Sequence, residues 1–101
     1  MVFIYTTCQN SEEARKIGKM IVEKKLAGCV NIWPIESIYF WEEKIKEDNE
    51  AVLLIKTTES KVAEIENIIL SNHSYAVPII ATIDIHRINR EYKEWLMKWV
   101  G

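Results

Sequence analysis

Residues 51–57 read Ala-Val-Leu-Leu-Ile-Lys-Thr, and the apolar run at their start decides the fold class. Five consecutive apolar side chains are typical of a strand that is buried on both faces of a sheet. Before this run, the segment 46–49 (Lys-Glu-Asp-Asn) predicts a polar turn. Residues 29–41 are rich in β-branched and aromatic side chains, but Pro34 among them cannot donate to a strand ladder. We therefore expect residues 29–41 to form one long, bent edge strand.

The remaining elements are read from alternation and from helical spacing of apolar residues. Residues 2–8 alternate between two partly apolar faces, which favours a central strand. Polar caps, glycine and proline mark where the other elements begin and end. The expected elements are a helix from Asn10 or Ser11 to Gly28, a helix from Ser60 to His73, a strand over 78–86 and a helix over 89–100.

The order of these elements is strand, helix, strand, strand, helix, strand and a terminal helix. It predicts an α+β fold, the ferredoxin-like βαββαβ sandwich with an added C-terminal helix, in a single domain over residues 1–101. Both crossover helices then cover one face of the sheet and leave the other open. Several strands are nevertheless apolar on both faces, so we expect burial against identical subunits.

Charge and composition argue against some classes of partner. The chain has 13 Lys and Arg against 15 Asp and Glu, a net charge of −2, whereas a nucleic-acid-binding domain usually carries a basic surplus. No apolar run approaches the roughly 18 residues of a membrane span. With two cysteines and no signal-peptide pattern, we expect a cytoplasmic protein with reduced thiols that binds neither nucleic acid nor membrane. The pairs Glu12-Glu13 and Glu42-Glu43 resemble solvated surface charge.

Few residues offer chemistry, and each has a structural alternative. Cys8 stands alone in its loop, as an incidental thiol or as a ligand, and Cys29 fits either core packing or a functional role. His73 suits a helix C-terminus or a site. Asp84 and His86 share a strand face, where they form a polar pair or orient a ligating histidine. No nucleophile and base pair can be named, so we expect a protein that is not an enzyme.

Five segments, in order along the chain, match motifs of one known family. The strongest is residues 26–32, Leu-Ala-Gly-Cys-Val-Asn-Ile. The others are Ser37-Ile38-Tyr39-Phe40-Trp41, Glu50 with Lys56-Thr57-Thr58, His73-Ser74-Tyr75-Ala76-Val77-Pro78 and Tyr92-Lys93-Glu94-Trp95. Over nearly its whole length the chain thus resembles the CutA family, known as divalent-cation tolerance proteins.

The resemblance implies a homotrimer, close in fold to the PII nitrogen signal proteins, whose sheets pair edge to edge between subunits. It implies a role in tolerance of copper and other divalent metal ions. Position by position, Cys29 and His73 match metal ligands proposed for the family. Two ligands are too few for a metal ion, so neighbouring residues or a second subunit must supply the others. It also implies a ligand cleft between subunits, with lining residues Tyr39, Trp41, Lys56, Tyr75 and Trp95.

The leading expectation is therefore a homotrimer that binds divalent metal, copper first. The alternatives are a PII-like signalling or small-molecule-binding module and a trimeric protein that anchors another protein. The chain departs from the family pattern in places. Ser74 replaces a usual Pro, Gly28 replaces an Ala, Glu42-Glu43 replaces a polar-Gly turn, and Ala76 and Ile79 stand where acidic residues are common.

Overall fold

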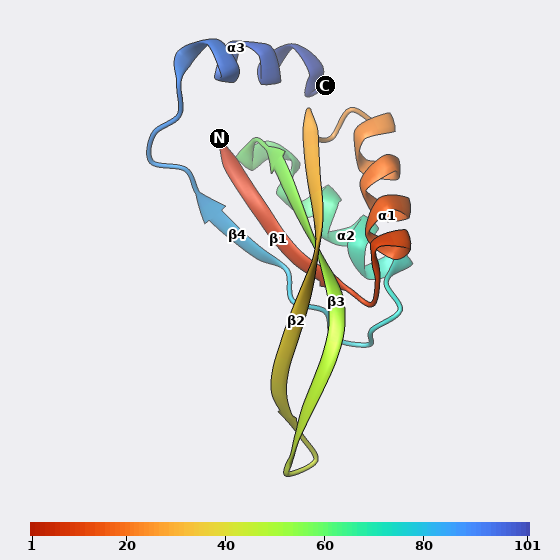
Figure 1. The fold of residues 1–101 in the computed structure, drawn as a ribbon. Coiled ribbons are helices and arrows are strands. Elements are labelled where there is room, and N and C mark those ends of the chain that lie inside the picture. Colours follow the sequence, from red (N-terminus) through yellow and green to blue (C-terminus); the bar gives the residue numbers. More distant parts are fainter.

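The computed structural model describes all 101 residues. Four strands and three α-helices follow one another in the expected order (Figure 1). A single 3-10 turn, Glu59–Lys61, leads into the second helix. The elements are β1 (Val2–Cys8), α1 (Ser11–Glu23), β2 (Cys29–Trp41), β3 (Lys44–Thr57), α2 (Val62–Asn72), β4 (Ala81–Asp84) and α3 (Arg90–Trp99).

The four strands form one antiparallel sheet in the order β2-β3-β1-β4. This is the strand order of the ferredoxin-like sandwich, so the predicted fold is confirmed. β1 and β3 are central, and β2 is an edge strand that runs unbroken through Pro34, as expected. Helices α1 and α2 lie on the same face of the sheet, and α3 crosses one end of it (Figure 1).

Two strand boundaries differ from the prediction. The turn between β2 and β3 is at Glu42 and Glu43, not at residues 46–49, because both glutamates adopt left-handed φ angles of 50° and 64° and close a tight hairpin. β3 therefore begins at Lys44. β4 covers only Ala81–Asp84, not residues 78–86. The first residue of β4, Ala81, pairs with Tyr5 of β1. Beyond Tyr5, the Thr7 carbonyl of β1 accepts a hydrogen bond from the His73 side chain instead.

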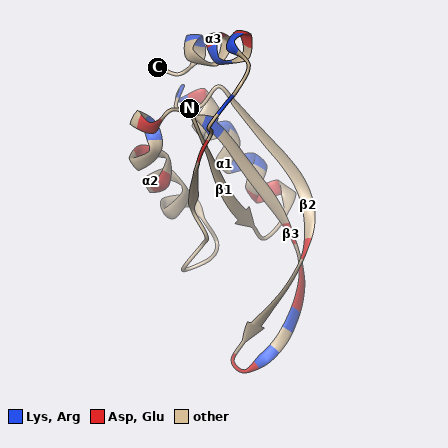
Figure 2. Ribbon diagram, turned by 90° about the vertical axis from the view of Figure 1, so that its left-hand side faces the viewer, with Lys and Arg blue, Asp and Glu red and all other residues tan.

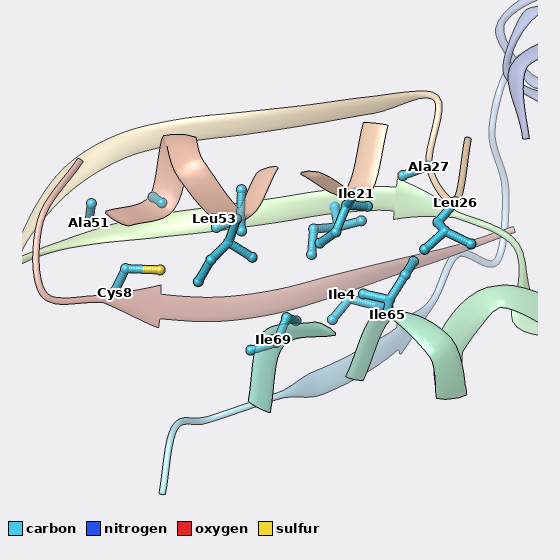
Figure 3. Close-up of a cluster of buried hydrophobic side chains, with 12 residues drawn as sticks. Ile4, Cys8, Ile21, Leu26, Ala27, Ala51, Leu53, Ile65 and Ile69 are labelled. Atoms are coloured by element: carbon cyan, nitrogen blue, oxygen red, sulfur yellow. The ribbon is translucent and has the colours of Figure 1, made fainter. Parts of the chain in front are cut away.

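The core lies between the sheet and helices α1 and α2 (Figure 3). Twelve buried apolar residues form it, none more than 3% exposed. Isoleucines at helical spacing on α1 and α2 pack there against the inward-facing residues of β1 and β3. The spacing of apolar residues in the sequence therefore matches the faces that the structure buries. The cluster consists of Ile4, Cys8, Ala14, Ile17, Ile21, Leu26, Ala27, Ala51, Leu53, Ile55, Ile65 and Ile69.

Much apolar surface lies outside this core. β2 and β3 continue beyond the helices as a two-stranded arm, whose outer part carries both acidic and basic residues in Figure 2. The arm gives the molecule extents of 46 × 26 × 20 Å. Ile38, Phe40 and Ile45 on the arm are 67–76% exposed. No helix is both long and apolar enough to cross a membrane.

Candidate metal site and open sheet face

His73 follows directly after α2, which ends where the Asn72 side chain donates to the Ile68 carbonyl (2.8 Å). The imidazole reaches across to the end of β1. Its Nδ1 accepts the backbone N–H of Tyr75 (3.0 Å), so the ring proton is on Nε2, which donates to the Thr7 carbonyl (2.8 Å). The side chain has no exposed area. These contacts fix the orientation of a buried imidazole ring.

Glu13 joins this histidine to the start of α1. Its backbone N–H donates to the capping side chain of Asn10 (2.8 Å), and its own carboxylate accepts the Gln9 N–H (3.1 Å). The same carboxylate accepts the backbone N–H (2.9 Å) and hydroxyl (3.0 Å) of Ser74. Burial raises the pKa of Glu13, but the hydrogen bonds that its carboxylate accepts from Gln9 and Ser74 outweigh burial, so the pKa lies below its usual value. Glu13 is therefore an anion at neutral pH.

Cys8 ends β1 beside these two residues and is fully buried. Its Sγ, a Glu13 carboxylate oxygen and a His73 ring nitrogen all lie within 4.8 Å of one another. No other group of three such ligand atoms occurs in the chain. Burial, and then the carboxylates of Glu13 and Glu50, raise the pKa of the Cys8 thiol to about 12. The thiol therefore keeps its proton at neutral pH unless a cation replaces it.

The predicted metal pair, Cys29 with His73, does not meet within one chain. Cys29 begins β2 opposite Lys56, and Lys56 in turn pairs with Phe3 on β1. His73 contacts Thr7, four residues further along β1, which corresponds to about 13 Å. The Cys29 thiol donates to its neighbour's carbonyl, at Val30. The pair remains a prediction that requires a second subunit.

The predicted cleft residues fall into two separate groups within one chain. At one end, the Lys56 ammonium lies 5.4 Å from the centre of the Tyr92 ring and 5.8 Å from that of Phe3. Tyr92 packs against Trp95 with ring centres 5.5 Å apart. The chain's two ion pairs are elsewhere, so Lys56 has no carboxylate partner. Tyr92, which is not among the predicted cleft residues, joins Lys56 to Trp95.

The other group lies near the base of the arm. The Tyr75 hydroxyl donates to Glu50 (2.6 Å), and the Tyr39 hydroxyl donates to Asp48. Burial, and then the Glu50 carboxylate, raise the pKa of Tyr75. Trp41 is beyond both, next to the hairpin turn. Glu50 and Lys56 are six positions apart on β3, which is about 20 Å, so one chain does not form a single cleft from these residues.

Glu13 is not among the site residues predicted from the sequence, and Cys8 is predicted there either as an incidental thiol or as a ligand. In the sequence, the pair Glu12-Glu13 resembles solvated surface charge. Glu13 nevertheless stands three residues after Asn10, which is the spacing of a capping box, and its carboxylate reaches back to the Gln9 N–H. Nothing local in the sequence links it to residues 73–75. Asp84 and His86 are both exposed, and neither makes a side-chain hydrogen bond.

Comparison with known proteins identifies the family. The family model described as CutA1 divalent ion tolerance protein matches residues 2–99. The divalent-cation tolerance protein CutA of Archaeoglobus fulgidus is 44% identical over 94 residues, covering 93% of this chain and 92% of that protein. The Thermococcus kodakarensis protein of the same name is 41% identical, covering 96% and 93%.

Solved structures agree over the whole chain. The structure of the A. fulgidus protein, described as a periplasmic divalent cation tolerance protein, superposes with a TM-score of 0.95 at 42% identity and covers both chains fully. CutA1 from Pyrococcus horikoshii superposes with a TM-score of 0.95 at 34% identity, covering 100% of this chain and 99% of that one. The chain belongs to the CutA1 divalent ion tolerance protein family.

Proposed function

We propose that this protein is a homotrimer without enzymatic activity that binds divalent cations, copper among them, and so contributes to metal tolerance. His73 carries the proposal. It is a buried imidazole, held in one tautomer by a backbone carbonyl, with its second nitrogen 3.9 Å from the Glu13 carboxylate. Histidines that ligate metals are typically oriented in this way. Membership of a family named for divalent ion tolerance supports the same function.

The exposed apolar arm supports the trimer. A two-stranded hairpin is marginally stable alone in water, and this one presents Ile38, Phe40 and Ile45 to solvent. The open sheet face adds Trp33 and Ile83, which are 41% and 46% exposed. Contact with other copies of the chain would bury these side chains. Such contact would also allow Cys29 of one subunit to approach His73 of another.

Native mass spectrometry tests the proposal. The purified chain is measured with Cu²⁺ or Zn²⁺ and a competing chelator, beside His73→Gln and Cys29→Ser variants. We expect a trimer that retains whole-number metal, and a His73→Gln trimer that loses it. A monomer would refute the assembly, and a trimer that yields all metal to the chelator would refute the metal function. The Cys29→Ser result decides whether that thiol belongs to the site.

Lys56 favours a second candidate, a module that binds a small anion. Its ammonium lies against two aromatic rings on the open face and has no carboxylate partner in the chain. A carboxylate or phosphate ligand would supply the missing charge. A thermal-shift screen of anionic metabolites tests this function. A ligand that raises the melting temperature of the wild type but not of Lys56→Met would support it, and no shift with any ligand would contradict it.

A further inference from the structure

We propose that Cys8, Glu13 and His73 of a single chain form a three-ligand site for a divalent cation of borderline softness, with Zn²⁺ as the type. The inference rests on the proposed metal function and names the ligands for it. It replaces the pair of Cys29 and His73 with a set that one chain brings together. Thiolate, imidazole and carboxylate are the three protein ligands of zinc sites.

The histidine is prepared for a metal at Nδ1. Its Nε2–H donates to the Thr7 carbonyl, and such a backbone contact fixes the tautomer in which the other nitrogen has a free electron pair. That electron pair now accepts the N–H of Tyr75, two residues further along the chain. A cation at Nδ1 would displace one local backbone contact and leave the Thr7 contact intact.

The separations suit one ion. Nδ1 of His73 is 3.9 Å from Oε1 of Glu13. With metal–ligand bonds of about 2.0 Å to nitrogen and oxygen, a tetrahedral ion holds two such atoms about 3.3 Å apart, so this pair closes by about 0.6 Å. The Cys8 Sγ lies within 4.8 Å of a Glu13 carboxylate oxygen and of a His73 ring nitrogen. The tetrahedral distance from sulfur is about 3.5 Å, so each of these separations closes by no more than about 1.3 Å.

The charges and the surroundings also fit. A Cys8 thiolate and the Glu13 carboxylate together neutralise a 2+ ion, which matters because Cys8 and the His73 ring are buried. The Glu13 side chain retains 10% exposure, so the site borders solvent. A water molecule can then enter as the fourth ligand, or the Ser74 hydroxyl, which lies 3.0 Å from Glu13 Oε1, can take that position.

Cobalt titration tests the site, because Co²⁺ takes zinc ligands and its bond to a thiolate gives a charge-transfer absorption band. The full chain is titrated as wild type, Cys8→Ser and Glu13→Gln. Matched controls are Cys29→Ser, which removes the other thiol, and Glu12→Gln, which removes the neighbouring carboxylate. We expect one Co²⁺ per chain with a thiolate band in the wild type and both controls.

The site variants should differ sharply from their controls. Cys8→Ser should lose the thiolate band and bind Co²⁺ at least roughly 100-fold more weakly, and Glu13→Gln should keep the band but weaken binding by roughly 10- to 100-fold. Circular dichroism without metal checks that each variant folds. If Cys8→Ser does not fold, the Co²⁺ affinities of Glu13→Gln and Glu12→Gln are compared. Weaker binding in Glu13→Gln alone supports the site, and equal binding in both variants contradicts it.

The other outcomes separate the two proposals. A thiolate band that disappears in Cys29→Ser and persists in Cys8→Ser would overturn this inference and leave the proposed metal function standing, with its ligands shared between subunits. Binding that no variant weakens would show adventitious surface binding and also overturn the inference. Absence of Co²⁺, Zn²⁺ and Cu²⁺ binding in the wild type would overturn both.

Discussion

Two buried threonines should respond in opposite directions to the same substitution. Thr6 on β1 and Thr57 on β3 are both fully buried. The Thr57 hydroxyl donates to the Leu26 carbonyl at 2.6 Å, whereas the Thr6 hydroxyl has no hydrogen-bond partner. Replacing either by valine keeps the shape of the side chain and removes only the hydroxyl. The two variants therefore measure how much one hydrogen-bonded hydroxyl and one unpaired hydroxyl each contribute to the free energy of unfolding.

The magnitudes follow from the hydrogen bonds. Thr57→Val leaves the buried Leu26 carbonyl without this donor, so the free energy of unfolding should fall by about 1–3 kcal/mol. Thr6→Val removes a hydroxyl that is buried without a partner, so the same quantity should rise by about 1 kcal/mol. One kcal/mol changes the unfolding equilibrium about fivefold, which a urea titration resolves.

Urea unfolding should be measured for wild type, both single variants and the double variant at one protein concentration, since the proposed subunit association would make stability depend on concentration. The two sites are about 13 Å apart along the sheet, so the double variant should show the sum of the single effects. A destabilised Thr6→Val would refute the inference that its hydroxyl is unpaired. An unchanged free energy of unfolding in Thr57→Val would refute the stabilisation assigned to the hydrogen bond between Thr57 and the Leu26 carbonyl.

Three further predictions test the hairpin, the assembly and the acid response. Glu43→Gly should raise the free energy of unfolding by about 1 kcal/mol, because φ is 64° there and glycine adopts it without strain; a loss in urea titration would contradict the left-handed turn. Phe40→Asp should dissociate the trimer in analytical ultracentrifugation, because this side chain is 76% exposed on the arm of one chain; an unchanged sedimentation coefficient would exclude the arm from the interface. Glu13→Gln should melt at a lower temperature than wild type at pH 7. The pKa of Glu13 is lowered in the fold, so its contribution is present above about pH 4.5 and is lost as the pH falls through the folded value. The difference in melting temperature should therefore disappear in acid, and a difference that stays constant down to pH 3 would contradict a stabilising carboxylate.

Local pattern was sufficient to predict most of the fold. The run at 51–55 marks a central strand, and the alternation over residues 2–8 marks its central neighbour. The isoleucines of α1 and α2 fall on the core face because helical spacing alone places them there. Pro34 is tolerated because β2 is an edge strand, as its presence indicated.

The hairpin and the site depended on information that the pattern lacks. Glutamate is not a residue that favours positive φ, so the residue types at Glu42 and Glu43 did not by themselves indicate a tight turn, and the polar residues 46–49 imitated one. Only the family resemblance placed a turn at Glu42 and Glu43. The contact of Glu13 with His73 and Ser74 joins segments about 60 residues apart, so only the tertiary structure reveals it. The same holds for the distance between Cys29 and His73, which follows from strand register.

Anomalous diffraction from crystals grown with Zn²⁺ would test most directly whether the protein holds a divalent cation at His73. Data collected above and below the zinc absorption edge locate the ion without assumptions about its ligands. We expect one anomalous peak per chain, within bonding distance of His73 Nδ1, Cys8 Sγ and a Glu13 carboxylate oxygen. A map with no peak at His73 while Zn²⁺ is in excess would contradict the account.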